Sequence, residues 1–263
     1  MVGVDLVWIL GPCVLESLDL ALRVADRLAE ASRDGRAIIF KSSYAKANRL
    51  RGDSYIGPGL EEGLQILERV REASGLPVTT DVHTPYEAHA AADAVDLLQI
   101  PAFLCRQTDL VVAAAETGKP INIKKGQFMA PADMGHIADK AVQAGNEKVI
   151  LTERGSTHGY GDLIVDFRSL PIMRGLGFPV CYDASHSVQT PGSAGGQSGG
   201  RREFLLPLLR AAVAVGVDAV FCEVHPDPLS AMSDRDTQWP LERLADLWAA
   251  AERHVAHKVR TDA

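Results

Sequence analysis

The chain has 263 residues, of which 46% are hydrophobic and 23% charged, as is ordinary for a soluble globular protein. A net charge of −7 without a basic face argues against a nucleic-acid partner, and no apolar run approaches the roughly 20 residues that span a bilayer. The four cysteines (Cys13, Cys105, Cys181 and Cys222) lack a disulfide-like spacing, which suits a reducing compartment, so we expect a cytoplasmic protein. The chain length fits one domain over residues 1–263.

Short apolar segments rich in β-branched residues alternate with segments whose apolar residues recur at helical spacing. The expected strands are Val7–Cys13, Arg36–Ser42, Pro77–Asp81, Leu97–Pro101, Pro120–Lys124, Lys148–Arg154, Pro179–Asp183 and Ala219–Glu223. A helix around Leu22–Leu28 follows the first strand, and the later helices are Leu60–Ala73, Pro85–Ala94, Thr108–Glu116, Ala132–Ala144, Ser169–Gly175, Glu203–Val215 and Leu241–His257.

Eight such strand and helix pairs predict an α/β fold, a single-domain (β/α)8 TIM barrel with a parallel sheet. The segment Thr190–Arg202 holds five glycines and would elsewhere resemble a linker. Because the same strand and helix pattern resumes after it, we expect a flexible loop at a site and no domain boundary.

In such a barrel the carboxyl ends of all strands meet on one rim, where the active site lies. The strand Ala219–Glu223 ends in a carboxylate that faces the same way as Phe221. A lone buried carboxylate costs roughly several kcal/mol, so Glu223 requires a partner on the rim. The residues at or just after the eight strand ends are Cys13, Lys41, Asp81, Gln99, Lys124, Arg154, His186 and Glu223.

One group of rim residues combines a thiolate, an imidazole and two carboxylates. It consists of Cys13, His186, Glu223 and Asp234. This mixture of soft and hard ligands suits one borderline divalent metal ion, such as zinc, iron(II) or manganese. Each residue alone has a structural alternative, because a strand cysteine is usually a small core residue and a rim histidine usually a hydrogen-bonded loop residue.

A second group of rim residues is cationic. It consists of Lys41, Lys46, Lys124 and Arg154, which Arg49, Arg51 and Arg106 could extend. Cations that project to one rim repel one another unless an anion binds between them, and phosphate and carboxylate are the anionic groups that such residues bind. The alternative is a solvated rim with salt bridges to Asp81, Glu153 and Asp183.

Ten strings of the sequence occur in the collinear order of one enzyme family. They are GPCVLES (11–17), FKSSYAKANR (40–49), GPGLEEGL (57–64), TDVH (80–83), LLQIPAFLCRQTDL (97–110), INIKKGQF (121–128), GNEKVILTERG (145–155), DASH (183–186), SGGRREF (198–204) and CEVHPDP (222–228). With them the chain resembles the 3-deoxy-D-manno-octulosonate 8-phosphate synthase family. The resemblance implies a homotetrameric barrel that condenses phosphoenolpyruvate with arabinose 5-phosphate, releases phosphate and supplies the lipopolysaccharide inner core.

The resemblance also assigns residues. The metal-free branch of the family has asparagine at the position of Cys13, so the chain resembles the metal-dependent branch, with the other ligands at His186, Glu223 and Asp234. The positions that match the phosphoenolpyruvate site are Ser43, Lys46, Gln99, Lys124 and Arg154. Asn48 and Asp81 match positions near the sugar hydroxyls, and Arg49 resembles a residue that reaches the pentose phosphate of a neighbouring subunit.

The expected catalytic residues are Asn48, Asp81, Lys124, Arg154 and His186. Lys41, Arg106 and Gln127 lie at or near the basic strand exits and are further candidates for substrate contact. The family commonly continues KANR with two serines, whereas Leu50 and Arg51 follow here. A serine that would touch the sugar phosphate is therefore missing, and Arg51 is a candidate substitute.

Two other functions are weighed against this one. The related synthase that uses erythrose 4-phosphate shares the barrel and the ligand set, but its second-strand loop usually reads KPRTS where this chain has KANR. A catalytically idle barrel that senses phosphorylated metabolites is the other alternative. Such a sensor has no need of a thiolate ligand, and the complete set of rim residues argues against it.

Overall fold

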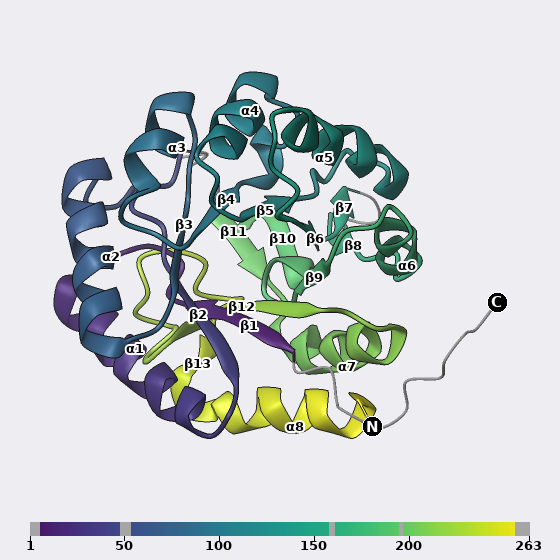
Figure 1. The fold of residues 1–263 in the computed structure, drawn as a ribbon. Helices are drawn as coiled ribbons and strands as arrows, with labels where there is room; N and C mark the ends of the chain where they lie inside the picture. The colour runs from purple at the N-terminus through teal and green to yellow at the C-terminus, as the bar shows by residue number, and fades with distance from the viewer. Residues whose placement is uncertain (1–5, 48–53, 158–160, 195–196, 256–263) are drawn as a thin grey trace.

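The computed structural model describes residues 6–47, 54–157, 161–194 and 197–255. Its central strands are β1 (Val7–Gly11), β2 (Ala37–Lys41), β3 (Val78–Asp81), β4 (Leu97–Ile100), β5 (Ile121–Lys124), β6 (Val149–Glu153), β9 (Val180–Asp183) and β12 (Ala219–His225). Each pairs in parallel with its neighbour in that order, and β1 pairs with β12. The sheet therefore closes on itself, and the predicted (β/α)8 barrel is confirmed (Figure 1).

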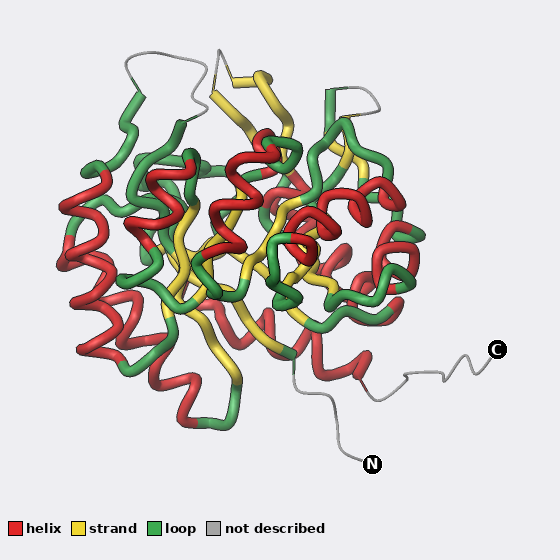
Figure 2. The backbone as a smooth tube through the Cα atoms, turned by 45° about the horizontal axis from the view of Figure 1, so that its top comes forward, coloured by secondary structure: helices red, strands yellow, loops and turns green. Residues whose placement is uncertain are grey.

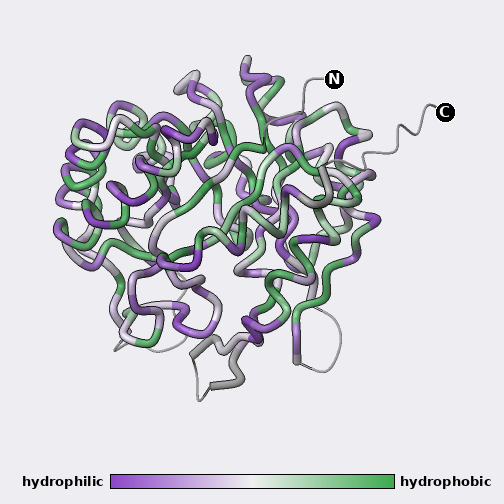
Figure 3. Tube along the Cα trace, turned by 90° about the horizontal axis from the view of Figure 1, so that it is seen from below, coloured by the Kyte–Doolittle hydropathy of each residue, from purple (hydrophilic) through white to green (hydrophobic). Residues whose placement is uncertain are grey.

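Helices surround the barrel in Figure 1. They are α1 (Leu18–Arg33), α2 (Leu60–Ser74), α3 (Pro85–Ala91), α4 (Thr108–Glu116), α5 (Met134–Gln143), α6 (Ser169–Arg174), α7 (Leu205–Val215) and α8 (Leu244–Val255). Two begin with a side-chain cap, since Ser17 accepts from the Leu20 amide and Thr84 from the Glu87 amide. Hydrophilic and hydrophobic residues alternate along the outer helices in Figure 3, as amphipathic helices require. Within the described part of the chain, no helix combines the length and apolarity needed to cross a bilayer.

The interior of the barrel is layered. Its apolar layer is a cluster of buried side chains from Ile9, Leu97, Cys181, Ala219 and Phe221. Because alternate strand residues share a face, the residues two positions nearer the carboxyl ends also point into the barrel. These residues include Gln99, Asp183 and Glu223, all at most 1% exposed. The strand period thus places polar groups directly above an apolar layer, on the rim where the site was expected.

The glycine-rich segment differs from the sequence prediction. Instead of an irregular loop, it contains β10 (Gln189–Ala194) and β11 (Gln197–Gly200), which pair as an antiparallel hairpin. The hairpin lies at the mouth of the barrel in Figure 1 and stands above it in Figure 2. A Cβ atom at Gly200 would lie 2.1 Å from Thr237 Cγ2, so glycine lets the hairpin approach the loop after β12.

Three other short strands were not expected. After β6, the strands β7 (Ser156–Thr157) and β8 (Leu163–Ile164) form a second small hairpin. Strand β12 continues two residues beyond its predicted end to His225 and pairs there with β13 (Trp239–Pro240). The segment between β12 and β13, which carries Asp234, is therefore held at both ends by strand pairing.

Candidate active site

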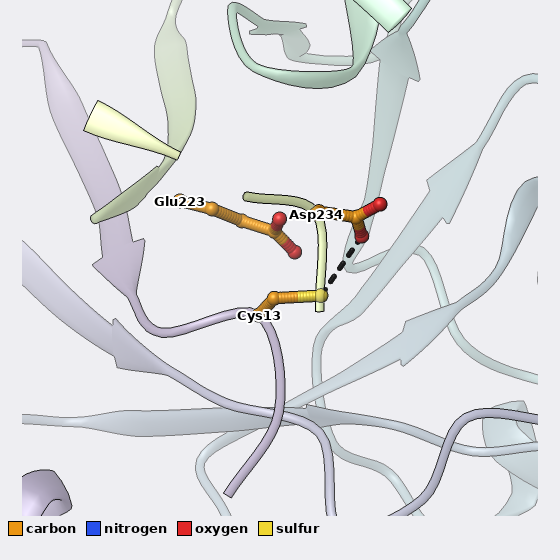
Figure 4. Close-up of side chains that lie close together, drawn as sticks. All are labelled: Cys13, Glu223 and Asp234. Atoms are coloured by element: carbon orange, nitrogen blue, oxygen red, sulfur yellow. Dashed lines mark hydrogen bonds between the residues drawn. The ribbon is translucent and has the colours of Figure 1, made fainter. Parts of the chain in front are cut away.

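Three of the four predicted metal ligands converge at one side of the barrel mouth. Cys13 follows β1, Glu223 lies in β12, and Asp234 lies between β12 and β13. One ligand atom from each lies within 4.8 Å of the other two, and Figure 4 shows the three side chains close together. We call Cys13, Glu223 and Asp234 the ligand cluster. The Cys13 thiol donates a hydrogen bond to Asp234 Oδ2 at 2.9 Å.

The electrostatics of the ligand cluster favour a cation. Burial, followed by the Asp234 and Glu223 carboxylates, raises the pKa of the Cys13 thiol well above its ordinary value, so a thiolate here needs a positive neighbour. Glu223 Oε2 is buried, and no donor within the described residues makes a hydrogen bond to it. An unsatisfied carboxylate oxygen beside a thiol and a second carboxylate fits a divalent metal ion.

His186, the fourth predicted ligand, lies beside the cluster but outside the group of mutually close atoms. Its Nδ1 is 2.7 Å from Asp183 Oδ2, and its backbone N–H donates to Asp183 Oδ1 at 2.9 Å. These contacts turn Nε2 toward the mouth, where it lies 3.6 Å from Glu223 Oε1. A carboxylate that orients an imidazole in this way is typical of metal-binding histidines.

Glu223 has the partner that its burial required. The Lys41 ammonium group donates to Glu223 Oε1 at 3.1 Å and to the Cys13 carbonyl oxygen at 3.0 Å. Although burial alone would raise it, Lys41, then His186 and Lys46, lower the pKa of Glu223. Lys41 is only 1% exposed and is engaged inside the protein. Its contact with substrate stays a prediction, whereas the structure shows it as the counter-ion of Glu223.

Across the mouth, four residues on consecutive strands form a hydrogen-bonded chain, which we call the polar ladder. The Thr152 hydroxyl donates to Asn122 Oδ1 at 2.5 Å, Asn122 Nδ2 donates to Gln99 Oε1 at 2.9 Å, and Gln99 Nε2 donates to Asp81 Oδ1 at 2.6 Å. Ser43 donates to the other Asp81 oxygen. All donors therefore point the same way, toward one carboxylate, and reinforce one another.

Besides Lys41, two further predicted cationic residues pair with carboxylates. Lys124 Nζ lies 2.6 Å from Asp183 Oδ2, and Lys46 Nζ lies 3.7 Å from Asp81 Oδ2 and donates to Ser43 Oγ at 2.9 Å. Two of the carboxylates named in the alternative of a rim with internal salt bridges, Asp81 and Asp183, thus do pair with these lysines. Although burial opposes it, the surrounding lysines hold the pKa of Asp81 well below its ordinary range, and His186 with Lys124 does the same for Asp183.

Arg154 retains a free donor. Its Nη2 donates to Gln189 Oε1 at 2.8 Å, and Gln189 Nε2 donates to Asp234 Oδ1 at 3.1 Å. Arg154 Nη1 is buried and meets no hydrogen-bond acceptor in the described ranges. Burial lowers the pKa of Arg154, but a guanidinium stays charged at neutral pH. An arginine with a buried, unpaired N–H is a ready donor for an anion.

Hydrogen bonds and ion pairs join most of the predicted residues into one network. The members are Cys13, Lys41, Ser43, Lys46, Asp81, Gln99, Lys124, Arg154, His186, Glu223 and Asp234. Gln127 is also buried, and its Oε1 finds no donor in the described part of the chain. Arg106 is exposed, and its carbonyl oxygen accepts from Lys140 Nζ at 3.4 Å.

Asn48 and Arg49, together with Leu50 and Arg51, lie outside the described residues. Their predicted roles at the sugar and its phosphate stay predictions.

Several residues of the network were missed by the sequence reasoning. Asp183 entered only as a salt-bridge acceptor, although its place at a strand end before His186 was a usable signal. Gln189 links Arg154 to Asp234 and Asn122 links the polar ladder, but neither lies in a pattern that predicts these contacts. Neutral amides carry no charge signal, so their function appears only when their partners are known.

Comparison with known proteins gives a consistent result. Residues 2–256 match the DAHP synthetase I family. Similar proteins named 2-dehydro-3-deoxyphosphooctonate aldolase occur in Acidithiobacillus ferrooxidans (54% identity, 95% of this chain, 89% of the relative) and Nitratidesulfovibrio vulgaris (55%, 90% and 87%). A third, from a Cyanothece species, is 57% identical over 85% of this chain and 82% of its own length.

Proposed function

Because the chain belongs to the DAHP synthetase I family, we propose that it performs the reaction of its similar relatives. It is a 3-deoxy-8-phosphooctulonate synthase, which condenses phosphoenolpyruvate with D-arabinose 5-phosphate and water to 3-deoxy-D-manno-octulosonate 8-phosphate and phosphate. The observation that carries this assignment is the shared name of relatives at least 54% identical over most of this chain. The product serves the inner core of lipopolysaccharide.

Phosphoenolpyruvate binds, in this proposal, above the apolar layer of the barrel. Arg154 supplies its unpaired Nη1–H and Lys124 its ammonium group to the anion. Both are about nine-tenths buried or more, at 6% exposure each, so their charge is weakly screened by water. Cations held in place before reaction stabilise the charge that develops in the transition state.

A divalent metal ion fits the ligand cluster, with His186 completing the set. The residues that would hold it are Cys13, His186, Glu223 and Asp234. When bound, such an ion supplies Lewis acidity toward an aldehyde or a water molecule. Lys41 balances the charge of Glu223, and Asp183 fixes the ring of His186. The identity of the metal is left open among zinc, iron(II) and manganese.

The reaction joins carbon 3 of phosphoenolpyruvate to the aldehyde carbon of the pentose. Water adds at carbon 2, and the resulting hemiketal phosphate expels inorganic phosphate by cleavage of its carbon–oxygen bond. Asp81 is one of the expected catalytic residues, and acceptance of a proton is one role that a carboxylate can take. The depressed pKa of its carboxyl group makes it a weak base, which favours a role as hydrogen-bond acceptor for sugar hydroxyls.

The assembly and its location are also part of the proposal. The family resemblance supports a homotetramer in the cytoplasm, in which Arg49 reaches the pentose phosphate of a neighbouring subunit. Light scattering on the purified protein checks the first point. A stable monomer with full activity would contradict the shared site.

The substrate is tested by comparing sugar phosphates. We expect phosphate release from phosphoenolpyruvate with arabinose 5-phosphate to exceed that with erythrose 4-phosphate by at least about 100-fold in kcat/KM, because buried polar groups are left unpaired by the shorter sugar. A preference for erythrose 4-phosphate would identify the related synthase. A protein that binds phosphoenolpyruvate but releases no phosphate with metal supplied would be a sensor.

A further inference from the structure

Gln238 connects the two chain segments that carry Cys13 and Asp234. Its side chain is fully buried, although it lies in the loop between β12 and β13. Gln238 Oε1 accepts from the Cys13 backbone N–H at 3.2 Å, and Gln238 Nε2 donates to the Ser233 carbonyl oxygen at 2.8 Å. The Gln238 amide therefore links the backbone of Cys13, one predicted ligand, to Ser233, which directly precedes the predicted ligand Asp234.

The backbone at Asp234 is held in a conformation that costs free energy. Its φ of 45° makes it the one positive-φ residue other than glycine within the described ranges. The backbone N–H groups of Thr237 and Gln238 both donate to the Asp234 carbonyl oxygen, each at 3.1 Å. Such strain persists only where the surroundings over-determine the backbone, and it concentrates at functional sites.

The arrangement also keeps the ligand side chains apart from Gln238 itself. Asp234 points its carboxylate at the Cys13 thiol, and the Ser233 hydroxyl lies 2.9 Å from the same sulfur atom. Gln238 contacts only backbone atoms of these segments in the hydrogen bonds that it makes. It therefore acts on the distance between the two ligand-bearing segments and does not occupy a coordination position.

We propose that Gln238 is a positioning residue that sets the separation of the Cys13 sulfur from the Asp234 carboxylate and thereby sets metal affinity. This inference rests on the metal site of the proposed function. Groups that orient metal ligands typically contribute about 10- to 100-fold to affinity. A glutamine suits the task because its amide offers an acceptor and a donor at opposite ends of one planar group.

The loop keeps a second attachment when Gln238 is changed. The Met232 backbone N–H donates to Glu16 Oε1 at 2.9 Å, which ties the loop to the segment after β1. A variant at Gln238 is therefore expected to fold. Gln238→Met removes both hydrogen bonds at similar length, and Gln238→Glu keeps the acceptor for Cys13 while losing the donor to Ser233.

Asn146 offers a matched control at the other end of the barrel. It is buried at 4% exposure, its Nδ2 donates to the carbonyl oxygens of Ala115 and Lys119, and its Oδ1 accepts from the Lys148 backbone N–H. It precedes β6 and so lies at the amino ends of the strands, away from the ligand cluster. Asn146→Leu removes a comparable set of backbone contacts without touching the proposed site.

The experiment measures Co²⁺ affinity by competition with a chromophoric chelator, together with the thiolate-to-cobalt absorption and the melting temperature of the metal-free protein. Gln238→Met is expected to weaken Co²⁺ binding by about 10- to 100-fold and to alter the absorption, with a smaller loss in Gln238→Glu. Asn146→Leu is expected to lower the melting temperature and leave affinity within about 2-fold of the wild type, since its effect is on folding alone.

Wild-type affinity in both Gln238 variants would overturn the inference while leaving the metal site intact. An equal loss of affinity in Asn146→Leu would also overturn it, because the effect would then be general destabilisation. A wild-type protein that takes up no cobalt would overturn the proposed metal site as well.

Discussion

The two sides of the barrel mouth are built from similar residue types but differ in how completely their polar atoms are paired. In the polar ladder, the side-chain oxygens of Asp81, Gln99 and Asn122 each accept a hydrogen bond. In the ligand cluster, Glu223 Oε2 has no donor within the described residues, and burial beside two carboxylates raises the pKa of Cys13. A saturated network fixes geometry, whereas an unsaturated one is prepared for a ligand.

The largest expected effect comes from Lys41, the counter-ion of the ligand cluster. Lys41→Met leaves Glu223 buried without its closest cation, and we expect the free energy of unfolding to fall by about 3–5 kcal/mol. Urea denaturation measures this loss. The exposed pair Arg27–Glu30 is the control, since Arg27→Met is expected to change stability by at most about 0.5 kcal/mol. Equal losses in both variants would mean that burial of the pair is unimportant.

Cys13→Ala tests the cluster itself. Removing a ligand is expected to cost more than removing a group that orients one, so metal affinity and kcat/KM with phosphoenolpyruvate should each fall by at least about 100-fold. Cys181→Ala is the matched control, because it removes a buried thiol that contacts Thr152 at the end of the polar ladder. If Cys13→Ala retained both metal and activity, the two sides of the mouth would not differ as described.

The pH dependence of stability distinguishes the ionised end of the polar ladder. The folded-state pKa of Asp81 lies below its ordinary value of 3.8, so its contribution is present above that value and is lost as pH falls further toward the folded-state pKa. Asp81→Asn is expected to lower the free energy of unfolding by about 1.5–3 kcal/mol at neutral pH. The difference in unfolding free energy between Asp81→Asn and the wild type, measured by urea denaturation at a series of pH values, should become smaller in acid. A difference that does not change with pH would contradict an ionised Asp81.

The smallest effect is expected for a single hydroxyl of the polar ladder. Thr152→Val keeps the side-chain shape but leaves Asn122 Oδ1 without its donor, which should cost about 1–2 kcal/mol. Thr79 is an equally buried threonine whose hydroxyl makes no hydrogen bond in the described part of the chain. Thr79→Val should therefore be neutral or stabilising. Chemical denaturation measures the unfolding free energy of both variants. An equal loss in Thr152→Val and Thr79→Val would show that the hydrogen bond of the threonine hydroxyl does not determine the cost.

The strands and their rim residues could be predicted from the sequence because both follow from local patterns. Short apolar runs predicted strands that end at or near Lys41, Asp81 and Glu223, and closure of the barrel brings these residues to one rim. The hairpin of β10 and β11 could not be predicted, since its glycines are typical of a loop and the close approach of Gly200 to Thr237 is not visible in the local sequence. Gln238 and Gln189 each make a hydrogen bond to a residue more than 30 positions away, which no local pattern specifies.

The most direct test of the central claim is phosphate release from phosphoenolpyruvate and arabinose 5-phosphate before and after verified removal of metal by a chelator. We predict that the metal-free protein is inactive and that a stoichiometric divalent ion restores turnover in the wild type but not in Cys13→Ala. Full turnover by protein that elemental analysis shows to be free of metal would contradict the account.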